Sequence, residues 1–389
     1  MVHHRTVAVA LDLTPDDLAA MLAGEPRYRV TQAWRGLHAG LAPLEMTDLP
    51  LALRRRLATE LPAGLALAAT SVSNDGGTTK WLWALPDPAG LRGPNAAAGL
   101  RGANAAAGLR GANAAAGLRG PNAAAGLRGP NAAAVETVLM HYPDRATVCV
   151  STQAGCAMAC GFCATGQAGF RRHLTAGEIV EQVVRGRRAA LPRRLSNVVF
   201  MGMGEPLANY AATWAAVERI HGDLGISARR LTVSTVGLVA GIRRLAGEAL
   251  PVNLAVSLHA ANDALRDELV PINRRWPLPV LMEACRGWVE AKGRRLSFEW
   301  ALIDGVNDRP TDATELAALA RPLGAHVNLI PLNPTPGYPT RGTPAAGVRA
   351  FGDRLRSLGV NATVRRNRGT DIDAACGQLA ARPTPTGVG

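Results

Sequence analysis

Three cysteines lie within eight residues of this chain, at Cys156, Cys160 and Cys163. Cysteine thiolates hold iron–sulfur clusters, and a cubane cluster normally takes four of them. Three thiolates at this spacing leave one iron open to a small molecule. Reductive cleavage of S-adenosylmethionine is the chemistry that uses such an open iron. The spacing therefore predicts a loop that holds a [4Fe-4S] cluster.

A zinc site and a set of inert buried cysteines are the alternatives. Zinc would need a fourth ligand, for which His173 is the nearest candidate, and zinc-binding cysteines usually come as two pairs. Inert cysteines do not normally crowd into so short a segment beside Gly155 and Gly161. The cysteine spacing favours the cluster.

Length and composition are those of a reducing-compartment enzyme. The chain has 389 residues, enough for two domains, and its hydrophobic content of 48% can fill a sizeable core. No stretch approaches the roughly 20 apolar residues of a membrane span, and the first residues lack a secretory pattern. Six cysteines in so long a chain are not a disulfide scaffold. We expect a cytoplasmic protein with no membrane partner, acting as a monomer.

The charge balance points to a polyanionic partner. The chain has 43 basic and 30 acidic residues, a net charge of +13. Neutralising phosphates releases their counterions, so a surplus of this size favours nucleic acid. Arginine doublets are spread along the sequence, and together they predict a basic surface.

A nonapeptide repeat interrupts the chain between residues 90 and 134. The unit Gly-Leu-Arg-Gly-Pro-Asn-Ala-Ala-Ala occurs five times, with Pro or Ala at its fifth place. A nine-residue period is compatible with a β-solenoid, but these units lack the regular large apolar residues of a stacked core. Gly, Asn and Ala bury too little surface to offset the ordering entropy. We interpret the repeat as a disordered surface loop without a catalytic role.

A small accessory region precedes the repeat. Thr14 and Pro15 form the start of a helix that runs on to Leu22, and residues 30–37 and 51–61 are predicted as two more. Residues 66–72 and 78–85 alternate as a strand pair around a turn, and residues 135–141 are expected to resume that sheet. The helices are predicted as either a substrate-recognition module or a packing domain.

Strand and helix patterns alternate after Arg145. Apolar runs rich in β-branched residues occur at 146–151, 197–201, 231–235, 252–258, 296–303 and 327–332. Amphipathic helices are expected near 176–190, 210–224, 238–246, 278–292 and 311–323, the first with a capping box between Thr175 and Glu178. Alternation of this kind indicates parallel strands, in an open sheet or a barrel. Six units are too few for a full eightfold barrel, so we predict an α/β fold with a partial (β/α)6 barrel.

Polar residues gather where the predicted strands end, and the cysteine loop follows the first strand. The C-terminal ends of the strands form the face on which barrel enzymes build their sites. The candidates for binding S-adenosylmethionine are Gly204, Glu205, Ser234, Ser257, Leu258, His259 and Asn333. Individually, a serine or asparagine at such a place is usually a cap or a turn. Their shared position predicts one common pocket.

Longer strings carry a resemblance to a known family. They are VETV (135–138), RATVCVS (145–151), GMGEPL (202–207), SLHA (257–260), LIPLNP (329–334) and DIDAACGQL (371–379). With the cysteine motif, they resemble the RlmN/Cfr family of radical-SAM RNA methyltransferases over nearly the whole chain apart from the repeat. Within the family, the sequence is more similar to the branch that methylates carbon 2 of adenine in 23S rRNA and tRNA.

The resemblance implies roles for three further residues. Cys376 would be methylated by one S-adenosylmethionine; a second one, cleaved at the cluster, would yield the radical that activates the Cys376 methyl group for addition to adenine. Cys149 would then resolve the covalent protein–RNA adduct by forming a disulfide with Cys376. Glu136 would accept the proton, a role that rests on the resemblance alone. Cys285 is assigned to packing.

The resemblance also implies the partners and the domain plan. We expect 23S rRNA and tRNA as substrates and a flavodoxin-type protein as electron donor. The expected plan is a helical RNA-recognition domain (1–65), a hairpin region with the repeat loop (66–141), a radical-SAM core (142–382) and a flexible tail (383–389). The rival hypotheses are methylation at adenine carbon 8, as in the Cfr branch, and a catalytically silent RNA-binding homologue.

Overall fold

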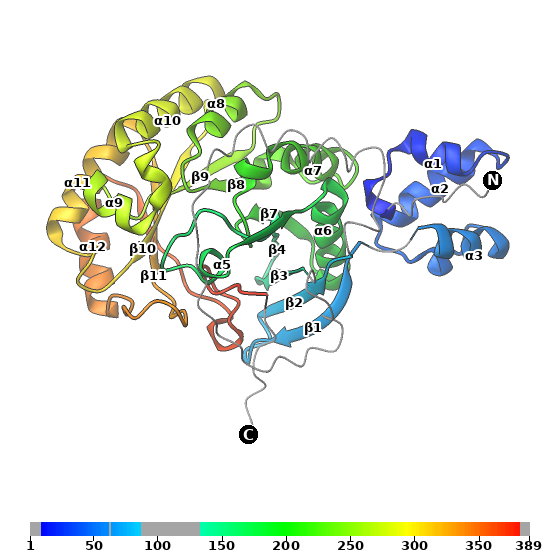
Figure 1. The fold of residues 1–389 in the computed structure, drawn as a ribbon, viewed down its shortest axis with the longest axis horizontal. Helices are drawn as coiled ribbons and strands as arrows, with labels where there is room; N and C mark the ends of the chain where they lie inside the picture. The colour runs from blue at the N-terminus through cyan, green and yellow to red at the C-terminus, as the bar shows by residue number, and fades with distance from the viewer. Residues whose placement is uncertain (1–8, 62–63, 87–132, 382–389) are drawn as a thin grey trace.

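The computed structural model describes residues 9–61, 64–86 and 133–381 of the chain. A ten-stranded sheet runs through it in the order β1-β2-β3-β4-β7-β8-β9-β10-β11-β12, and helices lie on the outside of the curved sheet (Figure 1). Most of the nonapeptide repeat and the expected tail at 383–389 fall outside these described residues.

Seven neighbouring strands of the sheet run parallel. They are β4 (Ala146–Cys149), β7 (Leu195–Phe200), β8 (Leu231–Thr235), β9 (Asn253–Ser257), β10 (Leu296–Leu302), β11 (His326–Pro331) and β12 (Ala362–Val364). Among the described residues, the outermost strands β1 and β12 each pair on one side, so the sheet curls without closing. The predicted α/β fold with a partial barrel is confirmed. Sequence patterns missed β12, which has three residues and too short an apolar run to stand out.

Helices between the strands cover the outer face (Figure 1). They are α6 (Ala176–Ala190), α7 (Tyr210–Gly222), α8 (Val239–Gly247), α9 (Asp263–Leu269), α10 (Leu278–Lys292), α11 (Pro310–Ala320) and α12 (Ala345–Ser357). The capping box of α6 forms as predicted, with Glu178 N donating to Thr175 Oγ1 over 3.1 Å. The pattern missed α9 and α12.

The two faces of the strands differ in burial. Trp300 of β10 is fully buried on the outer face, where it stacks on Phe351 of α12 with ring centroids 6.1 Å apart. Alternate residues of β7 and β8 are half-buried on the inner face, as the burial of these strands shows. This inner face is therefore lined by side chains that a substrate can reach.

The accessory helices α1 (Pro15–Met21), α2 (Arg27–His38) and α3 (Leu51–Glu60) lie beside the barrel (Figure 1). Charged groups in the segments that flank these helices contact α6: Asp12 precedes α1, and Glu45 lies between α2 and α3. Asp12 accepts from Gly177 N at 2.7 Å and from Thr175 Oγ1 at 2.9 Å. Glu45 forms an ion pair with Arg188 at 2.7 Å. These contacts set the orientation of the accessory helices on the core.

Three antiparallel strands extend the parallel sheet. They are β1 (Ala66–Val72), β2 (Thr78–Ala84) and β3 (Ala134–His141), and β3 pairs with β4 of the core. Residues 135–141 resume the sheet as predicted. The expected loop ends earlier than the repeat, because Ala134 already pairs with Ala84 and Ala133 O accepts from Leu85 N at 2.9 Å.

Candidate active site

The cysteine loop is closed at its neck by a second, two-stranded sheet. Strands β5 (Gln153–Gly155) and β6 (Phe170–His173) flank the loop, and Cys156 N donates to Gly169 O at 3.0 Å. Gly155 has a φ of +73°, and a Cβ there would lie 1.8 Å from Gly169 O. A residue with a side chain cannot occupy this neck. The glycine thus lets the two strands close into a compact loop.

The loop brings the three thiols into one electrostatic environment. Cys160 is buried, and Cys156 and Cys163 are half-buried. Burial raises the pKa of Cys156 to about 12. Burial, and then the neighbouring Cys163 and Cys156, also raise the pKa of Cys160. Thiols packed in this way ionise together when a cationic group neutralises them, as a metal cluster does.

Arg266 is fully buried and interacts electrostatically with Cys160 of the cysteine loop. Its guanidinium donates to Leu258 O at 3.0 Å, to Val236 O at 2.7 Å and to Asn273 Oδ1 at 2.8 Å. Its positive charge opposes the rise in the pKa of Cys160. The arginine therefore ties together two strand-end turns and supplies a buried cation beside the thiols.

His259 packs against the cysteine loop through Phe162. Its backbone is in the left-handed region, with a φ of 61°. Burial, and then Arg266, lower its pKa to about 3, so the ring is neutral. Its Nδ1 accepts from Ala301 N at 3.0 Å, which puts the ring proton on Nε2. The ring meets Phe162 edge-on with centroids 4.8 Å apart. His259 thus packs against the residue between two of the cysteines, while Leu258 is a core residue with no exposed surface.

Glu205 links the turns that follow β7 and β8. Its carboxylate accepts from Leu207 N at 3.0 Å and from Val236 N at 2.9 Å. Burial raises its pKa to about 7, against the lowering effect of these hydrogen bonds. Gly204 precedes it at a φ of +99°, where a Cβ would lie 2.5 Å from Gln153 Cβ. The turn is therefore held in one conformation at the mouth of the barrel.

The remaining strand-end residues divide between the pocket and the scaffold. Ser234 Oγ donates to Phe200 O at 2.7 Å. Ser257 is half-buried on the inner face, in register with Glu299. Asn333 is buried, and its Nδ2 donates to Cys376 O at 3.1 Å. Asn333 therefore holds the backbone of the segment that carries Cys376.

Cys376 and Cys149 come from distant parts of the chain to the same site. Cys376 is exposed on the C-terminal segment, and Cys149 is buried at the end of β4. Burial, and then the charge of the Cys376 thiolate, raise the pKa of Cys149 to about 12. One thiol is thus open to solvent and the other is kept protonated behind it.

Arg365 joins these cysteines to a polar network on the inner face. Its Nη1 lies 3.3 Å from Glu299 Oε2, and Glu299 Oε1 accepts from Asn328 Nδ2 at 2.8 Å. The charge of Cys376 is the largest cause that raises the pKa of Arg365, and Glu299 and Cys149 act in the same direction. The Arg365 guanidinium therefore interacts electrostatically with both cysteines.

Glu136 anchors the C-terminal segment to β3. Its Oε2 accepts from Ala380 N at 2.9 Å and from Ala381 N at 3.2 Å, and its Oε1 lies 3.0 Å from Lys80 Nζ. Burial raises the pKa of Glu136, and the charge of Lys80 opposes that rise most strongly. Lys80 Nζ also donates to Asp373 O at 3.3 Å. The pair thus fixes the segment on both sides of Cys376.

The chain as a whole is similar to known proteins. Residues 150–317 match the model of the Radical SAM superfamily. A Parafrankia protein described as "probable dual-specificity RNA methyltransferase RlmN" is 48% identical over 96% of this chain and 91% of its own length. A Chloroflexus aurantiacus protein of the same description is 47% identical over 92% and 88%. A crystal structure of a radical SAM methyltransferase from Sphaerobacter thermophilus, 44% identical, covers 96% of this chain and 100% of its own with a TM-score of 0.82.

The chain belongs to the RlmN family of radical SAM RNA methyltransferases. Membership implies S-adenosylmethionine and a [4Fe-4S] cluster. The described residues contain no group of three or more His, Cys, Asp or Glu side chains spaced to hold a single metal ion. A cubane binds its thiolates through separate irons, so its ligands need not converge on one point. The all-thiol donor set at the barrel mouth fits that group.

Sequence patterns do not single out three residues of this candidate site: Lys80, Arg266 and Arg365. The signal for Lys80 was present, since it is one of two lysines in a chain with 43 basic residues. Arg266 and Arg365 look like ordinary surface arginines in sequence. Across residues 9–61, 64–86 and 133–381, every helix is too short or too polar to span a bilayer.

Proposed function

We propose that this enzyme methylates carbon 2 of adenine in 23S rRNA and in tRNA, using Cys376 as methyl carrier and two molecules of S-adenosylmethionine per turnover. The observation that carries the proposal is the pairing of an exposed Cys376 with a buried Cys149 on the inner face of the barrel. A binding protein has no need for two unbonded thiols in one polar site.

The cluster ligands in the proposal are Cys156, Cys160 and Cys163. When bound, the [4Fe-4S] cluster supplies the electron for reductive cleavage of S-adenosylmethionine. Gly204, Glu205, Ser234, Ser257, Leu258, His259 and Asn333 are proposed to shape the site of that co-substrate. Their support is their common position at the strand ends, at the mouth that the cysteine loop covers.

Cys376 is the proposed acceptor of the first methyl group. Adenine carbon 2 lies between two ring nitrogens and is electron-poor, so it does not attack a sulfonium methyl directly. The Cys376 thiol is exposed, so a co-substrate can reach it from solvent. Cys149 is buried with a pKa near 12, which keeps it protonated while Cys376 reacts. This difference explains why one cysteine carries the methyl group and the other does not.

Cys149 is the proposed resolving thiol. After the Cys376 methyl carbon has bonded to adenine, the Cys149 sulfur would attack the Cys376 sulfur to form a disulfide. The electron pair of the broken carbon–sulfur bond would stay on the methylene carbon, which would take up a proton, so that RNA leaves with a methyl group. Glu136 is the proposed acceptor of the adenine proton. Burial raises the pKa of Glu136, which makes its carboxylate a stronger base than an exposed one.

The setting of the reaction is part of the proposal. A reducing cytoplasm would return the cysteine pair to thiols after each turnover, and a flavodoxin-type protein would supply the electron. The chain would act as a monomer. Residues 1–65 would serve as the RNA-recognition domain and residues 142–382 as the radical-SAM core, joined by the hairpin region 66–141.

The test is the modified nucleoside itself. Anaerobically reconstituted protein is incubated with unmodified 23S rRNA and tRNA transcripts, and the RNA digests are analysed by mass spectrometry against 2-methyladenosine and 8-methyladenosine. We expect 2-methyladenosine in both RNAs. Formation of 8-methyladenosine supports the Cfr-type alternative, and absence of both products supports a silent homologue. Cys160→Ala should abolish product and the brown chromophore, while Cys285→Ala, a buried cysteine of α10, should retain both.

A further inference from the structure

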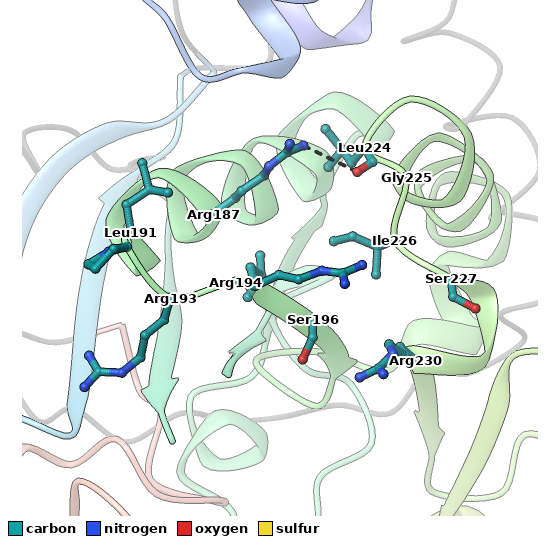
Figure 2. A pocket seen from close by; sticks show the side chains of 12 residues that line it. Arg187, Leu191, Arg193, Arg194, Ser196, Leu224, Gly225, Ile226, Ser227 and Arg230 are labelled. Atoms are coloured by element: carbon teal, nitrogen blue, oxygen red, sulfur yellow. Dashed lines mark hydrogen bonds between the residues drawn. The ribbon is translucent and has the colours of Figure 1, made fainter. Parts of the chain in front are cut away.

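A basic pocket lies on the core, away from the cysteine loop. It has a volume of about 430 Å³ and is formed where the end of α6 and the strand β7 meet the loop between α7 and β8 (Figure 2). Four arginines line it: Arg187, Arg193, Arg194 and Arg230. All four are exposed, above a floor that includes the buried Leu195 and Ile226.

The pocket is at the opposite edge of the sheet from the active site. Arg194 and Arg230 come directly before β7 and β8, so they lie at the strands' N-terminal ends. The active-site residues follow the C-terminal ends. The six residues of β7 span about 20 Å at about 3.3 Å per residue. The pocket is therefore separate from the site of methyl transfer.

The charge of the pocket is uncompensated within the described residues. No carboxylate lines it, and none of its four arginines forms an ion pair with a described acidic residue. Asp223, next to the lining residue Leu224, already faces Arg219 at 3.6 Å and His38 at 3.5 Å. Four positive charges around one hollow repel one another, so an anion bound there is favoured.

The donors suit a phosphate. Arg187 Nη1 donates to Leu224 O at 3.4 Å across the pocket (Figure 2). Among the described residues, its guanidinium makes no other hydrogen bond, so the remaining hydrogens can bind an anion. Ser196 is not available, because its hydroxyl donates to Asn197 Oδ1 at 2.7 Å. Guanidinium groups match the geometry of phosphate oxygens with paired hydrogen bonds. The pocket thus offers several charged forks around a space large enough for a phosphate group.

The surroundings distinguish a chain of phosphates from a small anion. Arg145 directly precedes β4 and Arg295 directly precedes β10, so arginines continue along this edge of the sheet beyond the pocket. On the other side, Arg188 follows Arg187 and pairs with Glu45 of the accessory helices. A single small anion would not use this extended row, whereas a polynucleotide backbone can.

We propose that this pocket binds a backbone phosphate of the RNA substrate, at a place distant from the adenine that is methylated. The proposal rests on the RNA methyltransferase activity of the family and does not depend on which adenine carbon is methylated. Its role is to orient a second segment of a large folded RNA against the enzyme. Phosphate contacts position a nucleic acid without reading its sequence.

The test compares RNA binding by matched charge variants. Arg193→Gln with Arg194→Gln removes two charges from the pocket, and Arg349→Gln with Arg354→Gln removes two from the exposed face of α12. Affinity for unmodified 23S rRNA and tRNA transcripts is measured across a range of salt concentrations. The pocket variant should lose at least tenfold in affinity, and its slope against salt should fall by about 0.7 to 0.9 for each lost phosphate contact. The α12 variant should resemble the wild type.

Further variants and a pyrophosphate control distinguish RNA binding from small-anion binding in the pocket. Arg193→Lys with Arg194→Lys should regain most of the salt slope, and the pocket variant should show a raised KM for RNA with an unchanged kcat. Equal RNA affinity and slope in the pocket and α12 variants overturns the proposal. If inorganic pyrophosphate stabilises the wild type but not the pocket variant while RNA binding is equal, the pocket is a small-anion site and the proposal is wrong. A wild type that neither binds nor methylates RNA contradicts the activity itself.

Discussion

Lys80 Nζ and Glu136 Oε1 lie 3.0 Å apart on neighbouring strands, with 4% and 1% of their side chains exposed. The pair lies behind the C-terminal segment that carries Cys376, and both of its members also bind backbone groups of that segment. Removing one member of a buried ion pair destabilises the folded state strongly, because the remaining charge is left in a low-dielectric environment without a partner. The stability of the fold and the position of the methyl carrier are therefore linked through it.

Replacement of Lys80 by Met should destabilise the protein by about 3–5 kcal/mol, the usual range when one partner of a buried pair is removed. Burial already raises the pKa of Glu136, and the charge of Lys80 is the strongest effect that lowers it. Without Lys80, the pKa of Glu136 in the folded state therefore rises further. The folded state then holds a proton that the unfolded state releases, so stability falls as pH rises above the unfolded carboxyl pKa. Urea denaturation should show a larger loss at pH 8 than at pH 5.

Adding Glu136→Gln to Lys80→Met is the control for this prediction. The double variant has no buried charge, so it should recover much of the lost stability and its pH dependence should disappear. Equal losses at both pH values in the single variant would contradict the assigned role of Glu136 as the group that titrates.

The two non-cluster cysteines should give opposite phenotypes. Cys376→Ala removes the methyl carrier, so neither product nor protein–RNA adduct should form. Cys149→Ala keeps the carrier but lacks the thiol that releases RNA, so a covalent complex through Cys376 should accumulate. A gel of each purified variant, with and without ribonuclease, distinguishes these outcomes. If Cys149 only packs the core, its truncation costs about 1 kcal/mol and the variant methylates RNA normally without bound RNA.

Arg365→Gln should slow the reaction of Cys376 with iodoacetamide several-fold at neutral pH. Cys376 is the largest cause that raises the pKa of Arg365, so the two groups interact electrostatically, and a thiolate is the reactive form of cysteine. Arg366→Gln, which changes the exposed next residue, should leave the rate unchanged. Peptide mass spectrometry of the alkylated protein gives the rate without any cofactor. Equal rates in both variants would rule out an electrostatic role for Arg365.

Six of the seven parallel strands could be predicted because each is a local apolar run followed by a polar turn, whereas β12 is too short to show one. The same pattern placed Glu205, Ser234, Ser257 and Asn333 at the strand ends. What sequence patterns did not supply was the partner of each polar atom. Glu205 binds the amide of Val236, and Asn333 binds the carbonyl of Cys376. Such contacts depend on how two turns meet in space, which local periodicity does not encode.

The same limit explains the missed charged residues. Arg365 pairs with Glu299 across 66 residues of sequence, and Lys80 pairs with Glu136 from the far side of the repeat. Arg365 looks in sequence like an ordinary basic residue, and nothing beyond the rarity of lysine in this chain marks Lys80. Their burial follows from strand pairing: β2 lies beside β3, and the backbone N–H of Arg365 donates to Leu329 of β11 at 2.8 Å.

Excision of residues 90–131, most of the nonapeptide repeat, should leave folding and methylation intact. Ala84 and Ala134 are direct partners in β2 and β3, so the two ends of the inserted segment are already neighbours in the sheet. Residues 133 and 134 must stay, because Ala134 pairs with Ala84 and Ala133 O accepts from Leu85 N at 2.9 Å. Deletion of residues 90–131 leaves a connection short enough for a hairpin loop, which closes at lower entropic cost than a long one.

For the 90–131 deletion, we expect an unchanged or slightly higher melting temperature and wild-type methylation of RNA transcripts. A variant extended to remove residues 90–134 should be less stable, since it loses these β-ladder contacts. Loss of activity in a well-folded 90–131 deletion would show that the repeat takes part in RNA methylation.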